Sequence, residues 1–357
     1  MRQPDEATSL CHSCPKLCRH ACPVAEAEQD EATTPWGKMS TMRMIDLGHL
    51  PLAPETASLA YKCLNCRASE SACELKNPVP ETLNHFRGRA FQAGVAPAAV
   101  YDYSKRFQDH NNPYGIDLLK RLKEGAPSEF KRPRTETAYF AGCTEIRHFP
   151  TAIGKSMKLL RGSGENPSLY REPILCCGYP LYVAGDLENF RELAEVNSQA
   201  LRPFRRVISG TPACLYTMET LYREFGYPVR ARFSHWVEIV KNGQRKIRDG
   251  KRVAYHDPCY LGRYRNVYEP PRRLIEQATG LPPREFGRSR QDSFCCGAGG
   301  LLPVTSPDTA QKITEERLRE FRLTGVRTLV SACPSCVRRF QKGSRGIKVI
   351  GLIDLLI

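Results

Sequence analysis

Sixteen cysteines are the residues of this sequence whose type and spacing could do chemistry. They form three groups with none left over. Seven lie near the N-terminus, four lie mid-chain and five lie towards the end: Cys11, Cys14, Cys18, Cys22, Cys63, Cys66, Cys73; Cys143, Cys176, Cys177, Cys214; and Cys259, Cys295, Cys296, Cys333, Cys336. In a reducing cytoplasm, clustered cysteines more often bind metal than form disulfides. The grouping therefore predicts several metal or cluster sites.

The first group has the spacing of ligands for a cubane [4Fe–4S] cluster. Cys11-x2-Cys14-x3-Cys18-x3-Cys22 ends in a proline, as such runs do, and has one extra residue in its second gap. In two-cluster ferredoxins the last cysteine of each run ligates the other cluster. That crossing predicts one complete ligand set and one that is a thiolate short: Cys11, Cys14, Cys18 and Cys73; and Cys22, Cys63 and Cys66, with Ser69 at the remaining position. We expect the second set to use Ser69 or another oxygen ligand, or to hold a [3Fe–4S] cluster.

The other two groups are copies of one pattern. In the later copy, Cys259 is followed after 35 residues by a Cys-Cys-Gly segment (295–297) and after 36 more by Cys333-Pro-Ser-Cys336. In the earlier copy the gaps are 32 and 36 residues, through the Cys-Cys-Gly segment at 176–178 to Cys214. Thr211 stands where the later copy has Cys333. The first copy therefore lacks one cysteine.

Alternating strands and helices are expected to position these cysteines. The segments 137–143, 206–214, 252–259 and 327–336 each read as a short apolar strand that ends at a cysteine. A strong helix is predicted from a cap at Ser306 to Gly325, and 187–201 is its counterpart. Such alternation favours a mostly parallel sheet, whose ligands bind beyond the carboxyl ends of the strands. One cluster per copy, or one between the copies, would follow.

The expected fold class is α+β multidomain. Helical periodicity at 41–48 and 57–63 predicts a small helical domain around the N-terminal cysteines. The expected division is an N-terminal α-helical ferredoxin-like domain, a polar and basic linker, and two α/β cysteine-rich (CCG) pseudo-repeats: 1–104, 105–134, 135–245 and 246–357.

These motifs resemble a known family. CHSCPKLCRHACPV, CLNCRASESAC and two CCG segments are similar to the cluster-binding subunits of heterodisulfide reductase in fused form, and to relatives that serve glycolate oxidase and anaerobic glycerol-3-phosphate dehydrogenase. HDPCYLGRYRNVYEPPR (256–272) and FCCGAGG (294–300) are especially similar. The resemblance implies that the five cysteines from Cys259 to Cys336 hold a non-cubane [4Fe–4S] cluster where thiols or disulfides react. Ser69 and Thr211 depart from the family pattern.

Simpler interpretations stay open for each group. Structural zinc is the alternative for the N-terminal seven and the terminal five, although adjacent Cys295 and Cys296 suit one tetrahedral zinc poorly. The middle four hold a cluster, bind zinc, or are buried thiols. The glycines at 297, 299 and 300 fit no dinucleotide fingerprint, so we expect them to let the backbone approach a cluster closely. His256 either caps a strand end or donates a proton to a departing thiolate.

Composition narrows the class of protein. The 357 residues carry 53 Lys and Arg against 38 Asp and Glu, a formal charge of +15, and no apolar run reaches membrane-spanning length. Without aromatic interleaving or a nucleic-acid motif, the basic runs do not predict nucleic-acid binding. We expect a cytoplasmic protein without a transmembrane segment of its own, with attachment to the inner face of the membrane through a partner as an open alternative.

The functional prediction is an iron–sulfur oxidoreductase subunit of a complex. Electrons would pass through the cubane domain to the cysteine-rich repeats, and the C-terminal cluster would reduce a disulfide or similar sulfur substrate. Because the sequence has no flavin or nicotinamide fingerprint, a flavoprotein partner (an FAD-linked dehydrogenase or an electron-transfer flavoprotein) is expected. The alternatives are a pure electron relay to a quinone site in a membrane partner, and a zinc-stabilised scaffold that is no enzyme.

Overall fold

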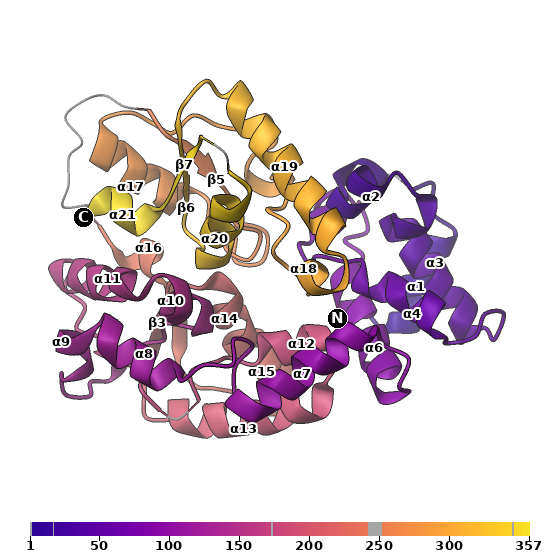
Figure 1. Ribbon diagram of the computed structural model, residues 1–357, viewed down its shortest axis with the longest axis horizontal. Helices are drawn as coiled ribbons and strands as arrows, with labels where there is room; N and C mark the ends of the chain where they lie inside the picture. Colours follow the sequence, from indigo (N-terminus) through magenta and orange to yellow (C-terminus); the bar gives the residue numbers. More distant parts are fainter. Residues whose placement is uncertain (1, 17, 173, 242–251, 345) are drawn as a thin grey trace.

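The computed structural model describes residues 2–16, 18–172, 174–241, 252–344 and 346–357. A helical N-terminal part lies beside two parts that each contain a parallel sheet (Figure 1). This arrangement confirms the expected α+β multidomain fold class. The expected boundary between the two repeats, at 245 and 246, lies outside the described residues.

The N-terminal part consists of helices with short connections. Its helices are α1 (Pro4–His12), α2 (Pro23–Glu28), α3 (Pro35–Asp46), α4 (Pro54–Tyr61), α5 (Ala68–Ser71), α6 (Val79–Gln92) and α7 (Ala98–His110), with 3₁₀ turns at Arg19–Ala21 and Glu31–Thr33. Proline begins several of these helices, which suits its fixed φ and its missing N–H. Met39, Met42, Leu83 and Phe86 pack together in a core of their own.

Residues 105–134, predicted to be a linker, contain packed helices. The end of α7 is followed by α8 (Leu118–Gly125) and α9 (Pro127–Phe130). Asp117 caps α8 by accepting a hydrogen bond from the Lys120 backbone N–H, and Leu118 and Leu122 are buried one turn apart. Both leucines and Phe107 belong to the hydrophobic core cluster that contains the buried residues of the first repeat and part of the second. The segment therefore adds a layer of helices to the first repeat, although its exposed face is polar.

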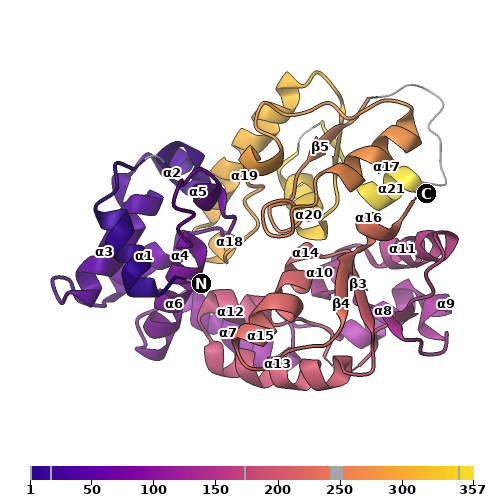
Figure 2. The same ribbon diagram turned by 180° about the vertical axis from the view of Figure 1, so that it is seen from behind.

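The first repeat runs from β1 to α16 around a four-stranded parallel sheet. Its order is β2-β1-β3-β4, and Figure 2 shows β3 and β4 side by side. Its elements are β1 (Thr137–Tyr139), α10 (Cys143–His148), α11 (Pro150–Gly162), β2 (Ser168–Leu169), α12 (Tyr179–Ala184), α13 (Leu187–Leu201), β3 (Arg206–Ser209), α14 (Pro212–Tyr216), a π-helical turn (Thr217–Leu221), α15 (Tyr222–Glu224), β4 (Arg232–His235) and α16 (Trp236–Ile239). The predicted helix at 187–201 is present as α13.

The second repeat, from β5 to α21, has the same topology. Its parallel sheet has the order β5-β6-β7, and an isolated bridge from Ala254 to Arg284 takes the place of β2. Its elements are β5 (Ala254–His256), α17 (Glu269–Thr279), a 3₁₀ turn (Arg290–Asp292), α18 (Leu302–Thr305), α19 (Pro307–Leu323), β6 (Thr328–Ser331), α20 (Pro334–Gly343), β7 (Lys348–Gly351) and α21 (Leu352–Leu356). The strong helix predicted from Ser306 is α19.

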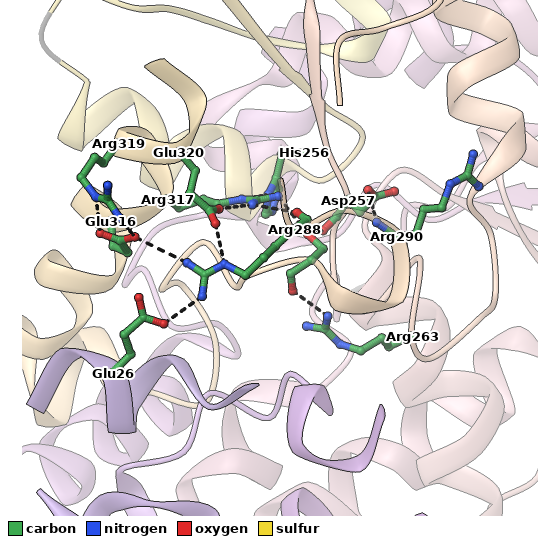
Figure 3. Close-up of polar contacts among 11 residues, drawn as sticks. Glu26, His256, Asp257, Arg263, Arg288, Arg290, Glu316, Arg317, Arg319 and Glu320 are labelled. Atoms are coloured by element: carbon green, nitrogen blue, oxygen red, sulfur yellow. Dashed lines mark hydrogen bonds and ion pairs between the residues drawn. The ribbon is translucent and has the colours of Figure 1, made fainter. Parts of the chain in front are cut away.

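The N-terminal helices pack against both repeats. Arg288 of the second repeat pairs with Glu26 of α2 over 2.8 Å and with Glu316 and Glu320 of α19 (Figure 3). Buried Leu64 and Val24 belong to the hydrophobic core of the second repeat. Within the described part of the chain, we find no helix with the length and apolar character that a bilayer crossing requires.

Candidate iron–sulfur centre

The first N-terminal ligand set converges around the end of α1. Cys11 lies in α1, and Cys14 and Cys18 follow it in the next turns. Burial first, and then charge on the nearby thiols Cys11, Cys73, Cys22 and Cys14, raises the pKa of the Cys18 thiol to about 12. The amide of Asn77 donates a hydrogen bond to Cys11 Sγ over 3.0 Å. The thiols of Cys11, Cys14, Cys18 and Cys73, with a supporting donor, suit the ligand set of one cubane cluster, since a coordinating metal ion keeps its thiols deprotonated.

The second set surrounds a separate small cavity. This cavity has a volume of about 20 Å³, and Cys22, Cys63, Cys66 and Ser69 all line it. Ser69 is buried in α5. The backbone N–H of Asn65 donates to Cys63 Sγ over 3.4 Å. Three thiols and one hydroxyl around one cavity form a donor set that fits a cluster with three sulfur ligands.

Sequence reasoning missed a lysine at this second site. Lys38 of α3 also lines the cavity and is almost completely buried, and its Nζ lies 3.9 Å from Cys22 Sγ. It also donates to the backbone oxygen of Lys62. A buried ammonium beside thiolates offsets part of their negative charge. Nothing in the local sequence distinguishes Lys38 from an exposed helical lysine.

One cavity of about 110 Å³ lies between the two repeats and is lined by cysteines of both. The thiols at its wall are Cys143, Cys177 and Cys214 from the first repeat, and Cys259, Cys295, Cys296, Cys333 and Cys336 from the second. Cys176 lies directly behind this wall, with its Sγ 3.6 Å from Cys143 Sγ. Tyr260 donates to Tyr179 across the same cavity over 2.7 Å. The two cysteine groups that the sequence shows as copies therefore face one space.

Thr211 occupies, in the first repeat, the position that Cys333 occupies in the second. Cys333 is the N-cap of α20 and follows β6, and Thr211 is the N-cap of α14 and follows β3, and these two strands hold matching places in their sheets. Both residues line the cavity between the repeats. Thr211 Oγ1 lies 3.4 Å from the backbone oxygen of Ala141, to which it donates a hydrogen bond. The first repeat thus presents four thiols and a hydroxyl where the second presents five thiols.

The N-terminal helices bring the second ligand set next to the second repeat. The neighbouring thiol of Cys295 lowers the pKa of Cys66 to about 6, with help from the Arg263 guanidinium and against burial. Arg263 donates to the backbone oxygen of Cys66 and, over 2.7 Å, to that of Ser293. A Cβ on Gly300 would overlap the carbonyl oxygen of Cys63, so this glycine permits close approach of the two backbones. We expected the glycines to let the backbone approach a cluster closely. At Gly300 the close approach is to the backbone of the neighbouring ligand run.

His256 sits at the end of β5 inside the second repeat. It is buried, and Arg317 Nε donates to its Nδ1 over 3.3 Å. Burial lowers the pKa of His256, while the neighbouring Cys296 thiol opposes that shift. One ligand atom each of His256, Cys296 and Cys336 lies within 4.8 Å of the others. These three side chains could also hold a single zinc ion, so the geometry alone leaves the zinc alternative open here.

Glu145 is a buried acid that sequence reasoning also missed. It lies in α10 and lines a second, smaller cavity of about 40 Å³ together with Cys333 and Gly210. Burial raises the pKa of Glu145 to about 8, against a hydrogen bond donated by Tyr139 Oη over 2.9 Å. Its other carboxylate oxygen is buried without a partner among the described residues. The sequence gives no sign that this carboxyl, two residues after Cys143, is buried.

Two segments of the chain, 137–219 and 253–341, match the model of the cysteine-rich domain named CCG. Both segments are CCG cysteine-rich domains. They coincide with the two repeats found from cysteine spacing, and each contains all the cysteines of its repeat. The expected pair of CCG repeats is confirmed.

Relatives extend the similarity over most of the chain. One component of the dihydromethanophenazine:CoB–CoM heterodisulfide reductase of Methanosarcina mazei is 27% identical over 310 residues, which cover 83% of this chain and 76% of that protein. One component of the fumarate reductase (CoM/CoB) of Methanothermobacter marburgensis is 24% identical, and the match covers 83% of this chain and 60% of that protein. The probable iron-sulfur-binding oxidoreductase FadF of Bacillus subtilis is 25% identical, and the match covers 83% of this chain and 46% of that protein. These similarities support an iron–sulfur oxidoreductase subunit.

Proposed function

We propose that this chain is the electron-transfer and sulfur-reducing subunit of an iron–sulfur oxidoreductase. The observation that carries the proposal is the cavity between the two CCG domains, which thiols of both domains line. Iron–sulfur clusters bound by these cysteines would supply reversible one-electron transfer. All sixteen cysteines are free thiols, and two further thiol sets lie in the N-terminal helical part, mostly between its helices.

The proposed route for electrons begins at the N-terminal helices. Cys11, Cys14, Cys18 and Cys73 would hold the first cubane cluster, and Cys22, Cys63 and Cys66 the second, with Ser69 as its further ligand. The second set lies against the second CCG domain, where Cys66 meets Cys295. Arg263 ties the two ligand loops together through backbone oxygens on both sides. This packing supports electron transfer into the second CCG domain first.

The proposed reaction is reduction of a disulfide. One disulfide bond takes up two electrons and two protons and breaks to give two thiols. The five cysteines of the second CCG domain, from Cys259 to Cys336, are the proposed ligands at the reacting site. The first CCG domain would bind a cluster through Cys143, Cys176, Cys177 and Cys214.

A partner must supply the electrons. The relatives with reductase names are subunits, and we propose a flavoprotein as the donor. The competing function is a pure relay, in which the chain passes electrons from an FAD-linked dehydrogenase to a quinone site of a membrane partner. The two functions differ in one measurement, because only the first consumes a small disulfide when a reduced viologen replaces the partner.

Cys333→Thr tests the proposal, since it gives the second CCG domain the same ligand set as the first. We expect loss of any non-cubane electron paramagnetic resonance (EPR) signature and of disulfide reduction, while the N-terminal sites still accept electrons from reduced viologen. Thr211→Cys is the converse variant and should retain turnover. If Cys333→Thr leaves spectrum and turnover intact while Cys214→Ala abolishes both, the reacting site belongs to the first domain.

A further inference from the structure

Each of the three cysteines of the second N-terminal set has a positively charged side chain of its own. Lys38 Nζ lies 3.9 Å from Cys22 Sγ, Arg87 donates to the backbone oxygen of Cys63 over 2.8 Å, and Arg263 donates to that of Cys66. Lys38 and Arg87 are buried, and Arg263 is half-buried. These three side chains, here called the cation shell, come from α3, α6 and the loop after β5. The shell is therefore complete only because the second CCG domain packs against the N-terminal helices.

No carboxylate balances the cation shell within the described part of the chain. Neighbouring cations do form ion pairs there: Lys62 with Glu28, and Arg67 with Glu70 and Glu81. The three members of the shell instead donate to uncharged carbonyl and amide oxygens, apart from the contact of Lys38 with Cys22. A buried charge without a counter-charge costs free energy. The thiolates and the group that they bind are therefore the anion that fits this shell.

The first N-terminal set has no such shell among the residues that the structure describes. Cys11 Sγ accepts a hydrogen bond over 3.0 Å from the Asn77 amide, which is uncharged. The cations near this set are more exposed and pair with carboxylates: Arg2 (27% exposed) with Glu6, and Lys16 (39%) and Arg19 (57%) with Glu31. Solvent and salt screen exposed charges far more than buried ones. The two sets therefore differ in the buried positive charge beside them.

We propose that the cation shell gives the second N-terminal cluster a higher reduction potential than the first, so that electrons pass from the first site to the second. Reduction adds one electron, and thus one negative charge, at the second site. The first site loses that electron, and no bond forms or breaks. Buried positive charge beside the ligands stabilises the reduced state, since net charge, hydrogen bonds to sulfur and solvent exposure set the potential of such clusters. This inference rests on the proposed function, because it gives the direction of transfer along the same route.

A redox titration of Lys38→Met, followed by EPR, tests the cation shell. Methionine keeps an unbranched apolar chain at this position and removes the charge. The titration uses full-length protein that is purified anaerobically with its clusters, and the signal that Ser69→Cys alters identifies the second site. In wild type this signal should respond at a higher potential than that of the first site. Lys38→Met should lower the midpoint potential of the second site by about 59 mV, which is tenfold in the equilibrium constant for one electron, and leave the first site unchanged.

Three further variants separate charge from packing. Lys38→Arg keeps the charge and should keep the wild-type midpoint potential. Lys62→Met removes the same charge next to Cys63, but Lys62 is 30% exposed and pairs with Glu28 over 2.7 Å, so we expect little shift. Arg263→Gln removes a charge while keeping an amide that can donate to the backbone oxygen of Cys66. It should shift the midpoint potential of the second site in the same direction as Lys38→Met.

The measured potentials separate this inference from the proposed function. Unchanged midpoint potentials in both Lys38→Met and Arg263→Gln would overturn the role of the cation shell, even if the protein reduces a small disulfide. So would a first site that is reduced at a higher potential than the second. An equal shift in Lys62→Met would overturn it too, because net charge alone would then account for the effect. If the expected shifts are found and no disulfide is turned over, the role of the cation shell stands and the proposed sulfur reaction fails.

Discussion

Arg87 joins the N-terminal helices to the first CCG domain through a single buried side chain. Its guanidinium donates to the backbone oxygens of Ala60 (2.9 Å), Cys63 (2.8 Å) and Val183 (3.1 Å). It thereby ties a carbonyl of the second ligand run to α12 of the first CCG domain. An arginine in an amphipathic helix normally predicts an exposed position, so the sequence gives no sign of this role.

We expect Arg87→Met to destabilise the protein by about 3 kcal/mol or more, because several buried carbonyls lose their donor. Anaerobic denaturant unfolding, followed by circular dichroism, measures this loss. Arg89→Met in the same helix is the control, since Arg89 is more exposed and pairs with Asp46. That change should cost no more than about 1 kcal/mol. Equal effects of both variants would show that the buried hydrogen bonds contribute little.

Ser69 is the residue on which the type of the second N-terminal cluster depends. Because it lines the same cavity as Cys22, Cys63 and Cys66, Ser69→Cys would complete a set of four thiolates. We expect the variant to replace an oxidised three-iron EPR signal by a four-iron cluster that is visible on reduction. Ser71→Cys is the matched control, since Ser71 ends the same short helix and does not line the cavity. An unchanged spectrum in Ser69→Cys would contradict the crossed assignment of ligands.

Cysteine spacing predicts these sets because ligands of one cluster are close in sequence or follow the same strand in each repeat. Lys38, Arg263 and Glu145 are different. Each reaches its site through packing between segments far apart in the chain, and an isolated charged residue carries no period or spacing. The residues that modify the environment of the thiols are therefore the ones that sequence alone did not reveal.

The glycine-rich loop 297–300 is the element that brings the second CCG domain against the N-terminal ligand run. Gly300 has φ +59°, and a side chain there would overlap the Cys63 carbonyl. Gly300→Ala should therefore separate the two ligand runs and slow electron transfer from the N-terminal clusters to the second CCG domain. Stopped-flow reduction by a viologen, followed at the separate spectroscopic signals, measures this transfer.

Gly280→Ala provides the control for backbone strain alone. Gly280 also has a positive φ, +75°, but nothing lies within 4 Å of the position of an added Cβ. Gly280→Ala should lower the free energy of unfolding by about 1–2 kcal/mol and leave electron transfer unchanged. If both variants behave alike, the close approach at Gly300 has no role in the transfer.

Helices with regular periodicity are predictable from the sequence, and the loops between them are less so. The helix α19 begins directly after Ser306, although the Ser306 side chain makes no capping hydrogen bond, and α13 spans the predicted residues 187–201. The strands before the cysteines are visible as apolar, β-branched runs. Charged residues dominate 105–134 and favour a linker, yet buried Leu118 and Leu122 attach α8 to the first repeat. Two apolar residues one turn apart are too short a pattern to outweigh ten or so polar neighbours.

At the level of the whole chain, the CCG domains and the N-terminal helices meet around adjacent thiol sets. The repeat in the sequence predicts two similar domains, but their mutual orientation depends on packing between them. The sequence therefore could not show that both cysteine groups face one cavity, or that Cys66 lies beside Cys295. Those two contacts support a continuous route from the N-terminal helices to the cavity.

Metal content decides between this route and a zinc-stabilised scaffold. We expect anaerobically purified protein to be brown and to contain at least two [4Fe–4S] equivalents, with roughly equal iron and acid-labile sulfide and little zinc. The physical reason is the donor set: adjacent cysteines and sets of five thiols exceed what one tetrahedral zinc can use, whereas iron–sulfur clusters present several metal ions to them. Cys18→Ala should lower iron and sulfide together, by about four atoms each, if it removes one cubane. Stoichiometric zinc without sulfide would instead favour a scaffold, with His256, Cys296 and Cys336 as the first candidates for its ligands.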